Sequence, residues 1–337
     1  IVFGDWSSDV CSSDLSKIAK MARVSTATVS RVINNPEKVS AKTRERVESV
    51  ISKLGYVPNQ QARSLRSQQT KMIAIIVPHS ADYLFTYPYF SIFLRETSLE
   101  LSRLGYHLIL TTDEPHNSVI DTYRVFTDKR LVDGFVVLDL KNEDERVDFL
   151  KLRNIPFVAV GRNEKDKDIS FVDTDNEGGA YLAGKHLARK GCSHVLFING
   201  PADQSVSLWR ERGFQKAAQE MNFTFLGRNG DFVEKSGFEI TKKHLGQFDG
   251  IFAASDLMAI GALKALREEG VSLPVVGFDD IPISSDVSPS LTTIHQPIDE
   301  VGRRAAINLI RLISEDHTET TILPVELIVR ESSEVKR

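Results

Sequence analysis

The sequence predicts two parts of different fold class, an all-helical head at the N-terminal end and a larger α/β body. Three observations support this prediction. Apolar residues repeat with helical period up to about residue 54, and short apolar runs alternate with helical segments from residue 72 onward. Charge divides at the same place: residues 16–71 carry 12 Lys and Arg against 3 Asp and Glu, a net +9, whereas residues 72–337 carry 30 against 40, a net −10. This asymmetry is typical of a head that binds nucleic acid, although a solvated basic face would explain the charge alone equally well.

Residues 1–13 fit neither part. The segment lacks an initiator Met, a basic region before an apolar stretch and a small-residue cleavage site, so it is not a secretory signal. It resembles the translated readthrough of a sequencing adapter, and we expect a non-native extension. The two cysteines form no C-x-x-C, and no run of about 18 apolar residues occurs. These features predict a cytoplasmic protein with no membrane partner, no metal site and no disulfide framework.

The head is predicted to span residues 14–57 as three short helices. Ser25 and Ser40 are candidate N-caps for the second and third helices, and Gly55 can supply the left-handed residue that ends the third. About three residues join the first two helices, which is helix-turn-helix geometry. The apolar stripes are Leu15, Ile18, Ala19 and Ala22 in the first helix, Val29, Val32 and Ile33 in the second, and Val47, Val50, Ile51 and Leu54 in the third.

The second helix presents small polar side chains and one long cation once its apolar stripe packs inward. Hydroxyls near a helix N-terminus suit phosphate contact, and small side chains allow close approach to a groove. Arg31 is long enough to donate two hydrogen bonds to a guanine edge, and Asn34 can contact base or backbone. The candidate DNA-binding residues of this helix and its cap are Ser25, Thr26, Ala27, Thr28, Ser30, Arg31 and Asn34.

Residues 58–71 have two possible interpretations. In the first interpretation, the segment is a linker, because Pro58 begins it and no strong apolar stripe follows. In the second, residues 59–66 form two helical turns that are too short to be stable alone and become ordered on DNA. Leu65 would then enter the minor groove, with Arg63 and Arg66 near phosphates.

The body alternates strands and helices. Repeated β-α units imply parallel sheets with helices on both faces, and about 260 residues is large for one such unit, so two lobes are predicted. Ligands of these sheets bind off the carboxyl ends of the strands, here in the cleft between lobes. The predicted strands are residues 72–77, 106–111, 134–139, 155–160, 194–199, 250–255 and 274–279.

Three segments, in this order and spacing, carry a resemblance to a known family. They are IAKMARVSTATVSRVINN, then VSAKTRERV, then LGYVPNQQARSLR opening into IAIIVP. On these segments, residues 14–337 resemble the lactose-repressor-type (LacI/GalR) transcription regulators from end to end. The resemblance implies a homodimer that binds double-stranded operator DNA at a pseudo-palindrome, most simply as the repressor of a carbohydrate-use operon. It implies no cofactor and a small effector, a sugar or a sugar phosphate, and it leaves open whether that ligand releases DNA or tightens binding.

The family match also assigns roles in the head. It places Thr26, Ala27 and Arg31 at base-reading positions, and Leu65 at the minor-groove lever with Ala62 and Arg66 flanking it. Arg23 departs from the family, because it occupies a turn position that is usually Gly. A residue other than Gly can enter the left-handed region there at modest cost.

For the body the resemblance is to the periplasmic sugar-binding fold with three chain crossings between lobes. It divides the body into one lobe of about 72–173 and 295–323 and another of about 174–294 and 324–337. By this resemblance, Arg210 would donate two hydrogen bonds to adjacent ligand hydroxyls or to a ligand carboxylate, and Asp279 would accept hydrogen bonds from sugar hydroxyls. Ser255 stands at a position where the family commonly has Asn. Aromatic residues of the segment 83–90 are expected to line the cleft through Phe85, Tyr87 or Phe90, with core packing as the simpler alternative for each. The candidate effector-binding residues are Phe85, Phe90, Arg210, Phe232, Ser255, Asp256, Asp279 and Gln296.

The sequence fits two other function classes less well than it fits a regulator. An enzyme is not expected, because the sequence contains no phosphate-binding loop, nucleophile elbow, H-E-x-x-H or dinucleotide motif. A transport binding protein would share the body fold, but it would not carry a +9 head. Binding to operator DNA distinguishes the regulator from the transporter, and turnover of a sugar would indicate the enzyme.

Overall fold

The structure, a computed structural model, describes residues 7–56, 69–78, 80–112, 119–166 and 168–334. It separates into two compact units, Ile1–Thr70 and Lys71–Arg337. Side chains are described from residue 14 onward, except those of Asn34 and Asp82. The predicted hinge segment and its three candidate DNA contacts, Ala62, Leu65 and Arg66, lie outside the described residues.

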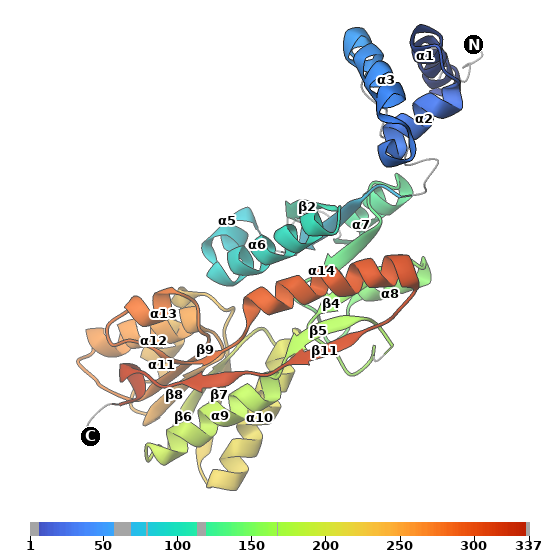
Figure 1. Cartoon of the computed structure of the whole chain (residues 1–337). Helices are drawn as coiled ribbons and strands as arrows, with labels where there is room; N and C mark the ends of the chain where they lie inside the picture. Colours follow the sequence, from blue (N-terminus) through green and yellow to red (C-terminus); the bar gives the residue numbers. More distant parts are fainter. Residues whose placement is uncertain (1–6, 57–68, 79, 113–118, 167, 335–337) are drawn as a thin grey trace, which may run out of the picture. The chain divides into compact units, whose positions relative to one another are not determined.

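The head is a bundle of three α-helices, as the apolar stripes predict (Figure 1). One face of each helix packs into a shared core that includes Ile18, Val29 and Val47. The first helix begins earlier than expected, because it extends back into the segment that we expected to lie outside the fold. The elements are α1 (Ser7–Ala22), α2 (Thr26–Asn34), a short 3-10 helix η1 (Pro36–Lys38) and α3 (Ala41–Leu54).

The turns of the head largely follow the sequence prediction. Arg23 has φ +52°, so it adopts the left-handed conformation that the turn requires. Ser25 caps α2, since its hydroxyl accepts a hydrogen bond from the Thr28 backbone N–H at 3.1 Å. Gly55 ends α3 with φ +60°. Ser40 precedes α3 as expected, but its hydroxyl donates to the Thr43 hydroxyl and caps no amide.

The first lobe of the body is a six-stranded sheet in the order β11-β5-β4-β3-β1-β2, with every neighbouring pair parallel. Helix α14 packs along β3, β4 and β5 and beside α6 (Figure 1). Strand β1 is buried on both faces, as its unbroken apolar sequence predicts. The elements are β1 (Met72–Val77), α5 (Ala81–Thr86), α6 (Pro88–Arg103), β2 (His107–Thr112), α7 (Val119–Asp128), β3 (Gly134–Val137), α8 (Glu145–Leu152), β4 (Phe157–Val160), β5 (Phe171–Thr174), α14 (Ile298–Glu315) and β11 (Thr320–Leu323).

The second lobe has a six-stranded sheet in the order β12-β10-β9-β8-β6-β7. Its strands are parallel except for β12, which runs antiparallel to β10. Helices α9 and α10 pack against each other, as do α11 and α12 (Figure 1). The elements are α9 (Asn176–Arg189), β6 (His194–Asn199), α10 (Ser205–Met221), β7 (Thr224–Asn229), α11 (Glu234–His244), β8 (Gly250–Ala253), α12 (Asp256–Glu268), β9 (Val275–Asp279), α13 (Ile283–Asp286), β10 (Thr292–His295), β12 (Glu326–Ile328) and a 3-10 helix η2 (Glu331–Ser333).

The chain crosses between the two sheets three times. The crossings follow β5, which ends at Thr174, β10, which ends at His295, and β11, which ends at Leu323. They lie within one or two residues of the boundaries expected from the sequence. Because every strand of both sheets except β12 is parallel to its neighbours, the carboxyl ends of the strands in each lobe gather at one edge, where a ligand site is expected.

Candidate DNA-binding face and effector cavity

The first turn of α2 forms the exposed polar face of the head. The side chains of Thr26, Ala27 and Arg31 are exposed, whereas Thr28 and Ser30 are half-buried. The exposed cap residue Ser25 also lies 2.9 Å from the Thr28 hydroxyl, so the two hydroxyls hold one another at the start of the helix. No acidic residue lies in this turn, and the free amides of a helix N-terminus favour an anion such as phosphate.

A cavity lies at the carboxyl ends of strands from both sheets, with about 690 Å³ of empty space when the part open to solvent is included. The first lobe contributes residues that follow β1, β3, β4 and β5, and the second contributes residues that follow β6, β7, β9 and β10. This is the position in which ligands of parallel α/β sheets bind. The lining residues are Tyr83, Tyr87, Tyr89, Phe90, Leu138, Asp139, Leu140, Val160, Gly161, Asp173, Thr174, Asn176, Gln204, Ser205, Val206, Arg210, Phe232, Asp279, Gln296 and Val301.

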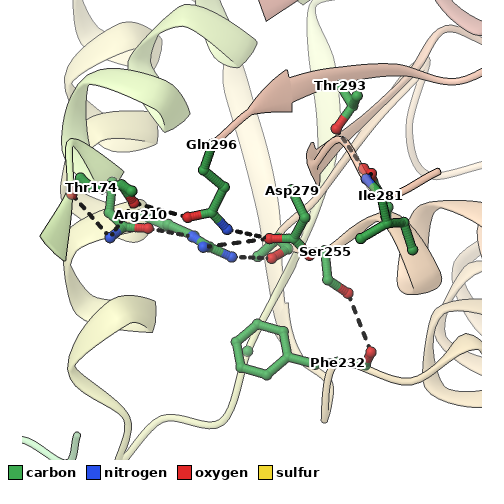
Figure 2. A network of polar contacts seen from close by, with 12 residues as sticks. Thr174, Arg210, Phe232, Ser255, Asp279, Ile281, Thr293 and Gln296 are labelled. Carbon is green, nitrogen blue, oxygen red and sulfur yellow. Dashed lines mark hydrogen bonds and ion pairs between the residues drawn. The ribbon is translucent and has the colours of Figure 1, made fainter. Parts of the chain in front are cut away.

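Asp279 is the centre of a buried polar network that joins the two lobes. Its carboxylate accepts hydrogen bonds from the Gln296 amide at 2.5 Å and from the Tyr87 hydroxyl at 2.5 Å. The Arg210 guanidinium lies 3.8 Å from the same carboxylate (Figure 2). Gln296 in turn accepts from the Thr174 hydroxyl at 2.9 Å, which ties the first and second crossings together.

Arg210 is held in place by contacts on several sides. It lies on α10 and is only 5% exposed. Its Nε donates to the Asn176 side chain at 2.9 Å, and its Nη1 donates to the backbone carbonyl of Ala254. The guanidinium also lies over the Phe278 ring, 3.7 Å from its centroid. These contacts compensate the cost of burying a cation, and they direct its remaining nitrogen toward Asp279.

Two carboxyl groups of the cavity titrate abnormally. Burial raises the pKa of Asp173 to about 6, although the nearby Arg162 and hydrogen bonds to its carboxylate oppose the shift. Burial also raises the pKa of Asp279, and Arg210, Tyr87 and Gln296 act in the opposite direction by stabilising its charged form. Both carboxylates are therefore strong acceptors in a poorly solvated space.

The structure brings five of the eight candidate effector-binding residues together at this cavity: Phe90, Arg210, Phe232, Asp279 and Gln296. The other three candidates do not line it and are corrected. Phe85 is 76% exposed, because it lies on the outer side of the short helix α5. Ser255 caps α12 and donates to the Phe232 carbonyl, so it supports the cavity wall from behind. Asp256 is fully buried and accepts from the Ile281 amide, Ser284 and Thr293.

The sequence did not identify several lining residues. Tyr83, Tyr89, Asp139, Asp173 and Gln204 reach the cavity from loops and strand ends that lie far apart in the chain. The only available signal was the density of aromatic residues after the first strand. No group of three or more metal-binding side chains is found within the described part of the chain.

Comparison with known proteins matches one family model to the N-terminal end of the chain and another to part of the body. Residues 14–59 match the family model described as bacterial regulatory proteins, lacI family, and residues 185–333 match the periplasmic binding protein-like domain. The HTH-type transcriptional regulator CelR of Thermobifida fusca is 34% identical over 94% of this chain and 97% of its own length. The chain belongs to the lacI family of bacterial regulatory proteins.

Solved structures of relatives resemble this lacI-family regulator along nearly its whole length. The CelR–cellobiose complex is 32% identical, with a TM-score of 0.73 over 94% of this chain and 99% of that one. The lac repressor dimer bound to operator and the anti-inducer ONPF is 27% identical, with a TM-score of 0.82 over 95% and 98%. The helix-turn-helix head and the two-lobed body predicted from the sequence are thereby confirmed, and the protein is a DNA-binding transcription regulator. None of the helices described in it has the length and apolar character needed to cross a membrane.

Proposed function

We propose that this lacI-family regulator is a repressor of a carbohydrate-use operon. It binds a pseudo-palindromic operator as a homodimer, and a small sugar-like ligand in the cavity between the lobes switches it. The observation that carries the proposal is the presence, in one chain, of an exposed α2 face and of a polar cavity to which both lobes contribute. A ligand bound there contacts both lobes at once, so it changes their relative position through its different affinity for the two arrangements.

The DNA half of the proposal rests on α2. Its exposed first turn offers helix-terminal amides and hydroxyls to phosphates, and Arg31, exposed in its last turn, is available for a base edge. The solved lac repressor is a dimer bound to operator, and a dimer presents two heads to two half-sites. Because operator DNA is chromosomal, we place the protein in the cytoplasm.

The effector half rests on the cavity. Asp279, Gln296 and Arg210 supply converging acceptors and donors, and Tyr83, Tyr89 and Phe90 supply aromatic surface. This combination suits a ring compound with hydroxyls at its edge and C–H groups on its faces. The solved CelR relative carries cellobiose, which has this chemistry.

We further propose that the cavity binds its ligand without chemical change. The best-placed carboxylate, Asp279, already accepts hydrogen bonds from Tyr87 and Gln296, so it is not free to act as a general base. Incubation of the purified protein with cellobiose should yield no new sugar product by chromatography. Release of glucose would contradict this part of the proposal.

The proposal is tested by DNA selection followed by titration. Fragments from upstream of the gene and its neighbours are incubated with the purified full chain, and bound fragments are sequenced. We expect enrichment of a two-fold symmetric site, and a change in its affinity when the ligand is added. Retention of all fragments with equal affinity would contradict sequence-specific regulation.

A further inference from the structure

Two buried oxygens of the cavity lack a hydrogen-bond donor. Gln204 Oε1 and Asp173 Oδ2 have no hydrogen-bond partner among the residues that the structure describes. Arg162 lies 3.4 Å from the Asp173 oxygen as an ion pair, without forming a hydrogen bond. Both residues line the cavity and are at most 6% exposed. A buried acceptor without a donor is costly, so this wall of the cavity favours a ligand that brings O–H or N–H groups over one that brings acceptors alone.

The charge of the lining is negative. Three carboxylates line the cavity, those of Asp139, Asp173 and Asp279, and the only basic residue among the described lining residues is Arg210. The guanidinium is already engaged by Asn176 and the Ala254 carbonyl, and its remaining charge faces Asp279. An anionic ligand would therefore meet three carboxylates, while the two nearby cations, Arg210 and Arg162, already face Asp279 and Asp173.

A helix N-terminus at the cavity could in principle attract an anion. Helix α10 begins at Ser205, and Gln204, Ser205 and Val206 all line the cavity. However, the Ser205 N–H donates to the Leu140 carbonyl at 2.8 Å, and the Ser207 N–H donates to the Gln204 carbonyl at 3.2 Å. The first turn of α10 therefore has two of its amides committed to carbonyl oxygens, which weakens it as a phosphate site.

Carboxylates also surround the aromatic rings. Asp139 and Asp279 both raise the pKa of the Tyr83 and Tyr89 hydroxyls, in addition to the larger effect of burial. These hydroxyls stay protonated, so each remains a donor as well as an acceptor. The rings of Tyr83 and Phe90 lie edge to face, 5.8 Å apart, and form a rigid aromatic wall.

We propose that the effector is a neutral polyhydroxylated sugar, and that the three carboxylates exclude phosphorylated sugars. This inference rests on the proposed function and narrows it, because the sequence favoured a sugar and a sugar phosphate equally. Sugar hydroxyls can donate to Gln204, Asp173 and Asp279, whereas a phosphate group at neutral pH carries about −1.5 to −2 charges and offers mainly acceptor oxygens. A phosphate group beside the three carboxylates adds repulsion and supplies no donor in place of the hydroxyl that it esterifies.

The test uses matched probes. Binding of cellobiose, glucose and ribose to the full chain is measured by calorimetry and thermal shift, each beside its phosphate ester: cellobiose 6′-phosphate, glucose 6-phosphate and ribose 5-phosphate. We expect at least one neutral sugar to bind and its phosphate to bind at least about 100-fold more weakly at low salt. Raising the ionic strength should reduce the difference in affinity between a sugar and its phosphate ester, because salt screens the repulsion. The affinity for the neutral sugar should stay unchanged.

Two isosteric variants separate local charge from net charge. Asp139→Asn removes a half-buried carboxylate at the cavity and should reduce the discrimination against phosphate about 10-fold. Asp286→Asn removes the same charge from an exposed site on α13, outside the cavity lining, and should leave the discrimination unchanged. Thermal melts without ligand show whether each variant is folded.

The outcomes are distinct. A phosphate ester that binds as tightly as its neutral partner overturns the inference, as does an equal effect of the two variants. If no probe of either class shifts the melting temperature while operator binding is intact, the sugar assignment fails and the DNA-binding function stands. Loss of sequence-specific DNA binding in the wild-type chain would instead refute the proposed function itself.

Discussion

At the scale of single residues, Asp279 connects the two lobes of the body. It is 1% exposed and would be costly to bury as an isolated charge, so its stability depends on the donors around it. Gln296 and Arg210 approach from the second crossing and from α10, whereas Tyr87 approaches from the other lobe. The Tyr87 hydroxyl thus occupies an acceptor site that a ligand hydroxyl would otherwise use.

Replacing Tyr87 tests this competition. We expect Tyr87→Phe to lower the stability of the body by about 1–3 kcal/mol, because a buried acceptor loses its donor. We expect the same change to raise the affinity for the neutral sugar that binds wild-type protein, by up to about tenfold, since the ligand no longer displaces the phenol. Thermal melts and calorimetry measure the two effects. Tyr89→Phe, at a lining residue without a hydrogen bond to Asp279, is the control, and equal affinity changes in the two variants would contradict the competition.

Asp173 should make stability depend on pH. Its pKa is raised to about 6, so between about pH 4 and pH 6 the folded chain holds a proton that the unfolded chain has lost. The folded state is therefore favoured at the acidic end, and about 3 kcal/mol is lost as the pH rises through this window. Asn at this position does not titrate. The melting temperature of wild type relative to Asp173→Asn should fall from pH 4 to pH 6 and then level off.

Comparing the two proteins at each pH removes the contribution of other buried carboxylates, such as Asp256, because they titrate in both. A difference in melting temperature that stays constant from pH 4 to pH 7 would show that Asp173 has an ordinary pKa. If the melting temperature of wild type rises relative to that of Asp173→Asn as the pH increases, the pKa of Asp173 is lowered in the folded chain and not raised.

In the head, Arg31 is the long donor on the exposed face of α2. We expect Arg31→Ala to weaken operator binding by about 1–3 kcal/mol and to relax preference at one base pair. Fluorescence anisotropy with the selected operator and its single-base variants measures both effects. Arg267→Ala, which removes an exposed arginine from α12, is the control. Equal loss on operator and random DNA would place Arg31 at a phosphate.

At the scale of elements, the sequence was most informative where side chains repeat regularly. The three head helices and seven strands of the body follow their apolar patterns. Five strands were not predicted, namely β5, β7, β10, β11 and β12, because most are short and all five are at or beside a sheet edge. In β7 a glycine and an arginine, Gly227 and Arg228, also interrupt the apolar run. Strand β2 has an apolar sequence, but it forms the other edge of its sheet and is half-exposed.

Residues of the candidate site could be predicted only where they belong to a recognisable sequence motif. Arg210 and Asp279 belong to recognisable segments, and the structure places them 3.8 Å apart. Asp173 and Gln204 could not be recognised, because their proximity to the other lining residues depends on how two sheets and two crossings meet. Local pattern does not encode that distance.

Close packing of α9 against α10 depends on glycine. A Cβ at Gly213 would lie 1.9 Å from the Glu177 carbonyl oxygen, which is backbone and cannot move aside cheaply. We expect Gly213→Ala to lower the melting temperature of the body and to cost about 1–3 kcal/mol by overpacking. The control is Gly227→Ala on β7, where the added Cβ meets only the Phe225 ring at 3.7 Å. Equal melting temperatures of the two variants would show that the helices separate without cost.

At the scale of the whole molecule, we expect the edge strand β2 to contact a second copy of the chain. An edge strand leaves backbone donors and acceptors unpaired, and it is a natural place for association. Leu110 on β2 is 36% exposed, and Leu99 on the adjacent α6 is 49% exposed. The solved lac repressor relative is a dimer, so a second copy of this chain is the occupant that we expect.

We therefore expect Leu110→Asp to shift the protein from dimer to monomer, because it places a charge in an apolar contact. A monomer carries one head, so it loses the gain in affinity from binding two half-sites at once. Affinity for the complete operator should fall steeply, while affinity for a single half-site stays near wild type. Analytical ultracentrifugation and anisotropy with both DNAs measure these changes, and Leu152→Asp, an 85% exposed site on α8, is the control. A Leu110→Asp protein that stays dimeric and binds the complete operator normally would place the dimer contact elsewhere on the body.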